Sequence, residues 1–380
     1  MSNYLHALAV KNSVPLSGHF ELTQNCNFSC PMCYVHQSGR KKELDAKTWL
    51  SLAEQAKKAG TLFLLLTGGE PFLRDDFEEI YTGLSKMGFL ISINTNGSLA
   101  EKYLLLLKKY PPFRVNVSLY AAEREEYKSF CGSDSFYSVK SSIEALQKSG
   151  ISVRLNSVFT RENRDSAKEI ISFSKEKKLH LKSTSYSYPK LRLGEPCGEN
   201  RARLSPLEAA ECEVSTDLEK FGLAAYAEKA KRLLSRENVA DCGEEYRRVR
   251  CRAGRSSFWL TWDGKMRPCG MLPKPEADPL ELGFEEAWRV LSDEVKKIRL
   301  PAECAVCERR RACPVCAAMC FCETGEFSKR PEYVCEFFEN LCRLSEEALS
   351  KKKSAAFRNE KSEEKSAENQ FDFEEDIYDC

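Results

Sequence analysis

Three cysteines lie close together near the start of the chain. They are Cys26, Cys30 and Cys33, separated by steps of four and three residues. A [4Fe–4S] cube has four irons, each of which takes a thiolate ligand in a closed site. Three closely spaced thiolates can hold three irons and leave the fourth open, so this spacing predicts an iron–sulfur site that does chemistry. A zinc site or three core thiols are the alternative interpretations.

A glycine pair supplies the second candidate site. Gly68, Gly69 and Glu70 directly follow the apolar run Leu-Phe-Leu-Leu-Leu at 62–66. Two glycines permit close approach of the backbone, and a carboxylate beside them can accept hydrogen bonds from an ammonium group. Polar residues at or near later strand ends extend the set of candidate contacts: Asn96, Ser118 and Arg154. Asn96-Gly97 is also a common turn, and a solvent-facing Arg154 is the alternative for that residue.

Residues 17–190 alternate short apolar runs with amphipathic stretches, which predicts an α/β fold. Strands are expected near 18–23, 62–66, 89–93, 115–119, 151–159 and 180–186, buried on both faces. Helices are expected near 45–59, 75–87, 99–109, 136–149 and 163–178. About six βα units imply a parallel sheet with right-handed crossovers. A partial (β/α)6 TIM-like barrel fits, and a flat doubly wound sheet shares the pattern. A barrel gathers chemistry at the carboxyl ends of its strands, which the cysteines and glycines follow.

The cysteine run, with Asn27 after the first cysteine and Tyr34 after the last, resembles the cluster loop of radical S-adenosylmethionine (SAM) enzymes. The resemblance implies that SAM chelates the open iron and is cleaved reductively to a 5′-deoxyadenosyl radical. Gly-Gly-Glu-Pro at 68–71 is similar to the family motif that holds the SAM amino group. The resemblance also implies further SAM contacts: Tyr34, Asn96, Ser118 and Arg154. Relatives often continue Ser-Leu with Asp-Gly, where this chain has Tyr120-Ala121, so substrate contacts do not transfer in detail.

The chain has 18 cysteines, and many lie between 242 and 342. In a reducing compartment such cysteines are typical of metal ligands, and zinc ribbons remain an alternative to iron–sulfur clusters. Their order resembles the SPASM domain, which implies two auxiliary [4Fe–4S] clusters. The implied ligands are Cys242, Cys251, Cys269 and Cys316 for the first, and Cys304, Cys307, Cys313 and Cys335 for the second.

Some cysteines fit this order less well. Cys313 and Cys316 are one residue closer than in the family, and Cys320 and Cys322 add choices of ligand. Cys197, in a loop after the sixth predicted strand, is a candidate for hydrogen or thiol chemistry. Cysteines outside these patterns, such as Cys131, are expected to be small core residues.

The predicted organisation has four parts. Residues 1–190 form the radical SAM barrel, 191–241 a loop and bridging helix near 205–236, 242–345 a small cysteine-rich SPASM domain, and 346–380 a charged, disordered tail. The net charge of +1 does not indicate nucleic-acid binding. The absence of a long apolar run or a signal peptide indicates a cytoplasmic protein that does not span a membrane.

The resemblance implies a peptide maturase, an oxidoreductase-type radical SAM enzyme that makes thioether or carbon–carbon crosslinks in a ribosomal peptide. Its partners would be a peptide or protein substrate and an electron donor such as flavodoxin or ferredoxin. Since the first predicted strand begins near residue 18, leader recognition is expected to need a separate leader-binding protein or the barrel surface. The alternatives are a protein oxidase of the anaerobic sulfatase-maturating type, a small-molecule radical SAM enzyme, and a non-catalytic iron–sulfur scaffold.

Overall fold

The computed structural model describes residues 2–35, 42–191, 196–236 and 243–359. Its centre is an eight-stranded sheet in the order β6-β5-β4-β3-β2-β1-β7-β8. Strands β1 to β7 pair in parallel and β8 runs antiparallel to β7. The strands are β1 (Ser17–Glu21), β2 (Phe63–Thr67), β3 (Leu90–Thr95), β4 (Arg114–Ser118), β5 (Val153–Val158), β6 (His180–Thr184), β7 (Ser257–Leu260) and β8 (Met266–Arg267). Because β6 and β8 are opposite edges, the sheet is an open, partial barrel, which confirms the predicted fold class.

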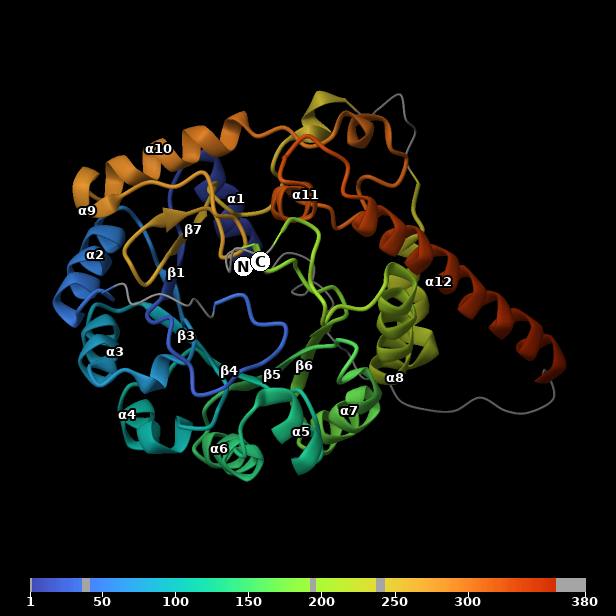
Figure 1. The fold of residues 1–380 in the computed structure, drawn as a ribbon, viewed down its shortest axis with the longest axis horizontal. Coiled ribbons are helices and arrows are strands. Elements are labelled where there is room, and N and C mark those ends of the chain that lie inside the picture. The colour runs from blue at the N-terminus through green and yellow to red at the C-terminus, as the bar shows by residue number, and fades with distance from the viewer. Residues whose placement is uncertain (1, 36–41, 192–195, 237–242, 360–380) are drawn as a thin grey trace.

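Helices cover the outside of the sheet in an arc (Figure 1). Five of them match predicted segments: α2 (Ala46–Lys58), α3 (Phe77–Lys86), α4 (Leu104–Lys109), α6 (Phe136–Lys148) and α7 (Ala167–Glu176). The helices that were not predicted include α1 (Ser2–Lys11) and α5 (Arg124–Cys131) in the barrel and those of the cysteine-rich segment described below. Helix α5 has only eight residues and begins with three charged ones; its apolar residues Tyr127, Phe130 and Cys131 have helical spacing but extend over little more than one turn.

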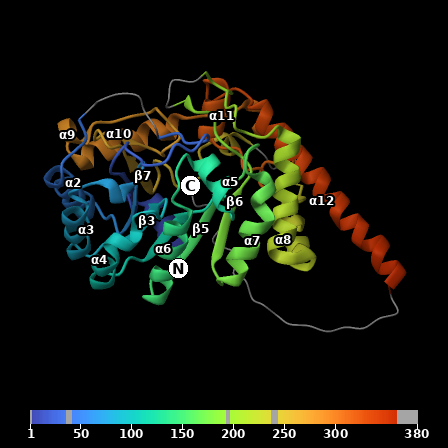
Figure 2. The same ribbon diagram turned by 60° about the horizontal axis from the view of Figure 1, so that its bottom comes forward.

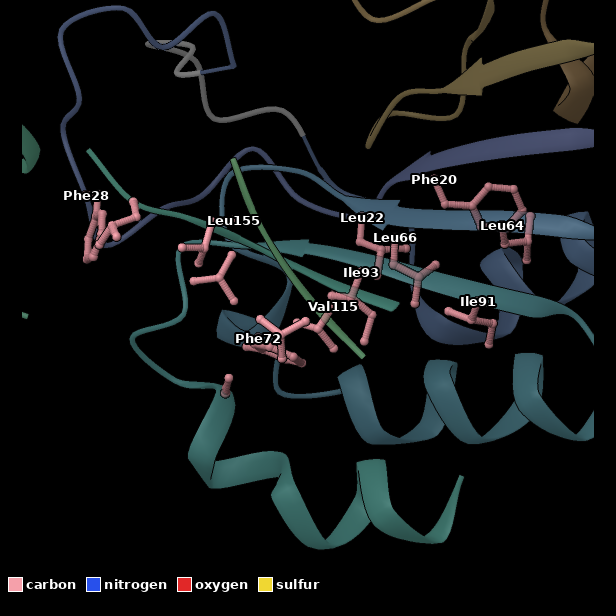
Figure 3. Packing of buried hydrophobic residues seen from close by; sticks show 14 of the residues in the cluster. Phe20, Leu22, Phe28, Leu64, Leu66, Phe72, Ile91, Ile93, Val115 and Leu155 are labelled. Carbon is pink, nitrogen blue, oxygen red and sulfur yellow. The ribbon is translucent and has the colours of Figure 1, made fainter. Parts of the chain in front are cut away.

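The two faces of the barrel strands differ, which corrects the expectation that both are buried in apolar surroundings. Alternate residues such as Leu64, Leu66 and Ile93 point outward and pack against the helices (Figure 3). In β5 the burial pattern alternates, and the less buried positions Arg154 and Asn156 line a central cavity. Polar residues occupy about every second position in β3, β4 and β5, whereas β2 is apolar up to its last residue, Thr67.

The cysteine-rich segment contributes strands to the same sheet. Residues Ser17 to Phe20 of β1 pair with Ser257 to Leu260 of β7. The ring of Phe258 packs on Phe284, with 5.0 Å between ring centroids. This contact anchors α10 (Phe284–Lys297), which follows α9 (Pro279–Leu282), beside β7. The part of the chain predicted as a separate domain is therefore joined to the barrel by backbone pairing and by apolar packing.

A hairpin turn at 262–265 connects β7 to β8, which pair antiparallel. The backbone N–H of Thr261 donates to the carbonyl of Lys265 at 2.9 Å, and Gly264 has a φ of +87°. This left-handed conformation favours glycine, which explains why Gly264 occupies the turn.

Two long helices extend beyond the barrel and pack on each other (Figure 2). Helix α8 (Pro206–Leu233) agrees with the prediction for 205–236; it begins with a capping box between Ser205 and Glu208 and is interrupted at Gly222. Helix α12 (Glu332–Asn359) follows α11 (Ala317–Thr324). The Tyr226 hydroxyl lies 2.6 Å from the Ser345 hydroxyl between α8 and α12.

The expectation of a disordered tail from residue 346 is wrong for residues 346–359, which continue α12. Leu344, Ala348 and Leu349 pack against the apolar cluster centred on α8, which gives this charged segment a buried side. Residues 360–380 lie outside the described residues. Within the described part of the chain, no helix combines the length and apolar character needed to cross a membrane.

A buried ion pair joins the barrel to the cysteine-rich segment. Arg203, just before α8, lies 2.8 Å from Glu323 of α11, and their side chains are 11% and 4% exposed. Glu323 also accepts a hydrogen bond from the Tyr186 hydroxyl after β6 at 2.8 Å. The Tyr333 ring of α12 lies against the Arg203 guanidinium at 3.7 Å. The pair therefore ties together four segments from both parts of the chain.

Replacing Arg203 with alanine is expected to lower the free energy of unfolding by about 3–5 kcal/mol, because the Glu323 carboxylate would remain buried without its cation. Urea unfolding of the iron-free protein measures the loss. The matched control is Arg289→Ala, which removes a pair with Glu286 whose side chains are 63% and 45% exposed, and should cost no more than about 1 kcal/mol. Equal losses from the two variants would contradict the structural role of the buried pair.

Candidate active site

The cysteine loop, residues 22–35, leaves the carboxyl end of β1 and carries the three predicted ligands. The pKa of the Cys26 thiol is raised to about 11, mainly by burial and to a smaller extent by the nearby charges of Glu70 and Cys33. A hydrogen bond with Cys131 raises the pKa of the Cys30 thiol most, followed by burial and by the charges of neighbouring cysteines, Cys33 and Cys26 among them. The three thiols therefore lie within electrostatic reach of one another, as the spacing predicted.

A single zinc ion and a [4Fe–4S] cube place different demands on three thiols. Among the described residues, no three His, Cys, Asp or Glu side chains converge on one metal-ion position. Zinc needs its ligands around one centre, whereas a [4Fe–4S] cube takes one thiolate at each iron and suits thiols that are further apart. Two N–H groups also point at the Cys26 sulfur, that of Phe28 at 3.4 Å and the Asn96 amide at 3.7 Å.

The glycine turn at the end of β2 packs directly on the cysteine loop. Gly69 N–H donates to the carbonyl of Thr23, and Glu70 N–H donates to the carbonyl of Asn25, both at 2.8 Å. A Cβ atom on Gly69 would lie only 2.1 Å from the Asn25 oxygen. At Gly68 the φ of +147° and a distance of 2.5 Å to the Thr23 oxygen also exclude a side chain without strain. Both glycines are therefore needed for the contact between turn and loop.

The Glu70 carboxylate has a different environment from the expected one. It is fully buried and accepts hydrogen bonds from the backbone of Phe72 at 3.1 Å and of Asn96 at 2.7 Å. The Thr95 hydroxyl lies within hydrogen-bond distance of both carboxylate oxygens, at 2.8 and 2.9 Å. These contacts join the ends of β2 and β3. The side chain of Glu70 therefore positions the ends of β2 and β3, and its predicted contact with an ammonium group stays a prediction.

Burial raises the pKa of Glu70 from 4.5 to about 7, against the effect of its hydrogen bonds. Because the native pKa exceeds the unfolded one, the contribution of Glu70 to stability falls as pH rises from about 4.5 to 7, by about 3 kcal/mol in total. Glu70→Gln is expected to remove this component from urea unfolding of the iron-free protein at pH 5 and pH 7.5. The exposed Glu78→Gln variant should keep the parent's pH difference, and an unchanged difference in Glu70→Gln would contradict the prediction.

Asn96 holds the cysteine loop. Its amide Nδ2 donates to Asn27 Oδ1 at 2.8 Å, and its Oδ1 accepts from the backbone and hydroxyl of Ser98 at 2.9 and 2.7 Å. Ser98 in turn accepts from the amide of Asn27 at 2.9 Å. The structure thus gives Asn96 a positioning role that the sequence did not indicate, and its predicted contact with ribose stays a prediction.

Ser118 and Arg154 occupy neighbouring strands that face the cavity. Ser118 ends β4 and hydrogen-bonds to Tyr120, whose pKa is raised well above its usual value by burial and by the nearby Cys30. Arg154 of β5 donates from Nε to Asn116 Oδ1 at 3.2 Å, and Asn116 donates to Asn94 at 2.8 Å. Arg154 therefore lines the barrel interior, which excludes the alternative of a solvent-facing side chain.

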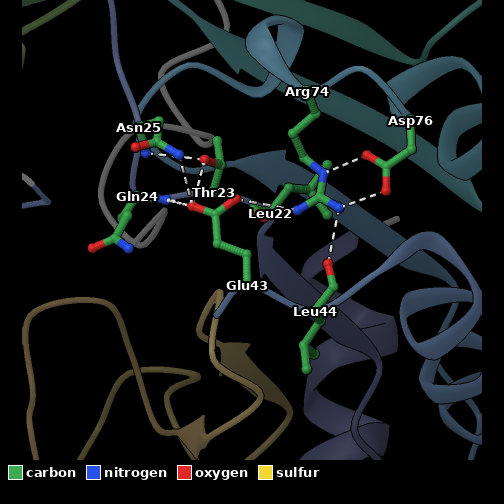
Figure 4. Close-up of polar contacts among 8 residues, drawn as sticks. All are labelled: Leu22, Thr23, Gln24, Asn25, Glu43, Leu44, Arg74 and Asp76. Carbon is green, nitrogen blue, oxygen red and sulfur yellow. Dashed lines mark hydrogen bonds and ion pairs between the residues drawn. The ribbon is translucent and has the colours of Figure 1, made fainter. Parts of the chain in front are cut away.

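A polar network that sequence reasoning missed holds the start of the cysteine loop (Figure 4). Glu43 Oε1 accepts from the Thr23 hydroxyl at 2.8 Å and from the Gln24 N–H at 2.9 Å. Arg74 donates to the carbonyl oxygens of Leu22 and Leu44, at 2.6 and 2.8 Å, and to Asp76 at 2.7 Å. The sequence feature that could have pointed to this network is Arg74, a charged residue only three positions after the Gly-Gly-Glu-Pro motif.

A cavity of about 730 Å³ runs through the barrel. Tyr34 lines it beside the cysteine loop, while Cys251, Cys269 and Cys316 line it on the side of the cysteine-rich segment. Arg154 and Lys182 contribute positive charge, and none of the lining residues that the structure describes carries a carboxylate. The cavity thus connects the neighbourhood of the thiol triplet with the predicted first auxiliary ligands and suits an anionic group.

The predicted ligands of the second auxiliary cluster lie together. Burial is the largest cause of the raised pKa of Cys304, Cys313 and Cys335, which reaches about 12 for Cys313. Cys335 and Cys307 both raise the pKa of Cys304, and Cys335 also raises that of Cys313, so the four thiols are neighbours.

The first auxiliary set is only partly described. Cys242 lies outside the described residues, whereas Cys251, Cys269 and Cys316 share the cavity. Burial and the charges of Cys269 and Cys316 raise the pKa of Cys322, which makes Cys322 a neighbour of this set. Cys320 is buried and is close to Cys316 and Cys304. Cys197 is exposed, lies beside Gly325 and Cys322, and is not among the described residues that line the cavity.

Comparisons with known proteins agree with this arrangement. The model of the radical SAM superfamily matches residues 20–174. A probable GTP 3′,8-cyclase of Saccharolobus solfataricus is 36% identical over 166 residues, which are 42% of this chain and 54% of that protein. The match therefore spans about half the length of that relative. A probable GTP 3′,8-cyclase of Metallosphaera sedula is 31% identical over 260 residues, which are 65% of this chain and 78% of that protein.

Two solved structures share the fold beyond the barrel. SuiB of Streptococcus suis, bound to the precursor peptide SuiA, has a TM-score of 0.64 and 18% identity, and covers 88% of this chain and 80% of its own. Native anSMEcpe with bound AdoMet and Kp18Cys peptide has a TM-score of 0.66 and 19% identity, and covers 90% of this chain and 99% of its own. Because these matches cover 88% and 90% of this chain, they extend beyond the barrel into the cysteine-rich segment.

Proposed function

Because the chain belongs to the radical SAM superfamily, we propose that it is a peptide maturase whose substrate is a residue of a peptide held in the barrel cavity. The cofactors of the superfamily are SAM and a [4Fe–4S] cluster. The proposal is carried by one observation: the same cavity is lined by Tyr34 of the cysteine loop and by Cys251, Cys269 and Cys316 of the cysteine-rich segment. A substrate radical formed there would lie close to an auxiliary electron acceptor.

Different residues of the site would bind the cluster and SAM. Cys26, Cys30 and Cys33 would hold the cluster, and Gly68 and Gly69 let the turn approach the loop for binding of the SAM amino group. Arg154 faces the cavity, where it can pair with the SAM carboxylate. When bound, the cluster and SAM supply a 5′-deoxyadenosyl radical that abstracts hydrogen. The protein positions these groups and keeps them from water.

Two kinds of support favour a peptide. The fold is shared over most of the chain with SuiB and anSMEcpe, whose solved structures contain a precursor peptide and the Kp18Cys peptide. The auxiliary thiols face the cavity, where a cluster that they hold could accept the electron given up by a substrate radical. The proposal includes a thioether or carbon–carbon crosslink, an electron donor such as flavodoxin or ferredoxin, and a separate leader-binding protein.

The test is the formation of 5′-deoxyadenosine after anaerobic reconstitution and reduction with dithionite, quantified by mass spectrometry. The peptide encoded by the adjacent reading frame is co-expressed and weighed in parallel. We expect deoxyadenosine, and a peptide lighter by two hydrogens. Deoxyadenosine with an unchanged peptide would reject the peptide substrate, and no deoxyadenosine would reject radical SAM chemistry in favour of a non-catalytic scaffold.

A small-molecule substrate is the second candidate, favoured by the sequence relatives named probable GTP 3′,8-cyclase. The cationic lining of the cavity would also suit a phosphate. Adding GTP to the reduced enzyme distinguishes the two: a GTP-derived product would support this candidate. Modification of a sulfatase-type peptide containing cysteine, without crosslinking, would support the protein oxidase alternative.

A further inference from the structure

A cation is buried among the ligands predicted for the second auxiliary cluster. Arg310 lies between Cys307 and Cys313 in the sequence, and the residue is only 2% exposed. Its backbone N–H donates to the carbonyl of Cys307 at 3.0 Å. Its Nε donates to the carbonyl of Tyr246 at 3.1 Å, which directs the guanidinium into the interior of the cysteine-rich segment.

No carboxylate compensates this charge within the described part of the chain. None of the ion pairs there, defined by an N–O distance of at most 4.0 Å, includes Arg310. The turn that carries Arg310 also carries two of the ligands, because the backbone N–H of Cys313 donates to the carbonyl of Arg309 at 3.0 Å and Arg310 is three residues from both Cys307 and Cys313. A guanidinium that is buried without a counter-charge destabilises the folded protein, so an anion is expected beside Arg310.

We propose that Arg310 is the counter-charge of a [4Fe–4S] cluster held by Cys304, Cys307, Cys313 and Cys335, and that it makes this cluster easier to reduce. The inference rests on the proposed function for the presence of the cluster. A cube with four thiolates is negatively charged, and each electron adds one negative charge. A nearby buried cation therefore stabilises the reduced form more than the oxidised form.

The electron balance is simple. One electron would enter the cluster from dithionite or, during turnover, from the substrate radical; the donor is oxidised by one electron as the cluster is reduced by one, and no bond forms or breaks at the cluster. Arg310 thus favours the second auxiliary site as the place where an electron leaves the cavity. As a positioning residue, it acts through the cluster and does not contact the substrate.

Arg330 provides a matched control. It hydrogen-bonds to Cys335 of the same set, but its side chain is 41% exposed and lies 3.3 Å from Glu332 and 3.9 Å from Glu339. Water and the two carboxylates already screen its charge. Arg330→Met is therefore expected to change the cluster much less than Arg310→Met.

The experiment uses the full chain, reconstituted with iron and sulfide, in a background where Cys26, Cys30 and Cys33 are alanine. Titration with dithionite, followed by electron paramagnetic resonance, then reports the auxiliary clusters independently of SAM cleavage. Arg310→Met is expected to lower the equilibrium constant for one-electron reduction of one auxiliary signal about tenfold, a shift of about −59 mV. Arg310→Lys, which keeps the charge, should restore most of the potential.

Iron content is measured beside the potential. Loss of the cluster in Arg310→Met but not in Arg310→Lys also supports a counter-charge, whereas equal loss in both variants overturns it. Unchanged potentials in Arg310→Met at full iron content, or equal shifts in Arg310→Met and Arg330→Met, overturn it as well. A parent enzyme that makes no deoxyadenosine would reject the proposed function while leaving the potentials of Arg310→Met and Arg310→Lys as a separate result.

Discussion

Replacing Cys30 with alanine is expected to reduce 5′-deoxyadenosine formation by more than about a hundredfold. Cys30 is the middle cysteine of the triplet in sequence, and the charges of both Cys26 and Cys33 raise its pKa, so it lies near the other two ligands. Loss of a residue that merely orients a metal ligand costs 10- to 100-fold, and loss of the ligand itself should exceed that. The measurements are deoxyadenosine yield and iron content per chain after anaerobic reconstitution.

Cys131→Ala is the matched control for this prediction. Cys131 is a fully buried thiol at the end of α5 that hydrogen-bonds to Cys30, yet it does not belong to the predicted ligand set. It should keep iron and deoxyadenosine near the parent level. If Cys131→Ala loses both and Cys30→Ala loses neither, the assignment of the triplet as the cluster site is wrong.

Replacing Gly69 with alanine is expected to lower the rate of SAM cleavage by roughly a hundredfold. The new Cβ would lie 2.1 Å from the Asn25 oxygen and 2.5 Å from its carbonyl carbon, both backbone atoms of the cysteine loop. Relief of the clash must move the loop or the turn, and a displacement of about 1 Å at a reacting site costs on the order of 10²-fold. Overpacking should also cost about 1–3 kcal/mol of stability.

The control for Gly69 is Gly83→Ala in α3. Its Cβ would lie 2.5 Å from a terminal methyl of Leu50, a flexible side chain that can rotate away. Deoxyadenosine rate and urea unfolding are measured for both variants. A Gly69→Ala enzyme with the parent's rate would show that the contact between turn and loop does not control the site.

Much of this protein could be predicted from local sequence. Strands such as β2 and helices such as α2 follow from short apolar runs and amphipathic periodicity, which residues close in the chain determine. The spacing of Cys26, Cys30 and Cys33 identified the candidate cluster site for the same reason, since the three ligands share one loop. Helix α5 was missed because eight residues carry too weak a periodic signal.

The sequence alone also identified Gly69 and Arg154 as site residues, but tertiary structure decided what they contact. Gly69 is needed because the Asn25 carbonyl, 44 residues earlier in the numbering, lies against it. Glu70 turned inward because the ends of β2 and β3 bring the Thr95 hydroxyl and the Asn96 N–H to its carboxylate. Hydrogen bonds between distant strands leave no periodic trace in the sequence.

Tertiary structure likewise decided how the two parts of the chain combine. The pairing of β1 with β7 joins residues about 240 positions apart, and the Arg203–Glu323 pair closes the same interface. Local sequence does not distinguish Arg310 from the other arginines and lysines of the chain, whereas its burial in the cysteine-rich segment does. Residue types and local spacing thus determined the elements and the kind of chemistry, whereas burial and long-range pairing decided which charges and hydrogen bonds control it.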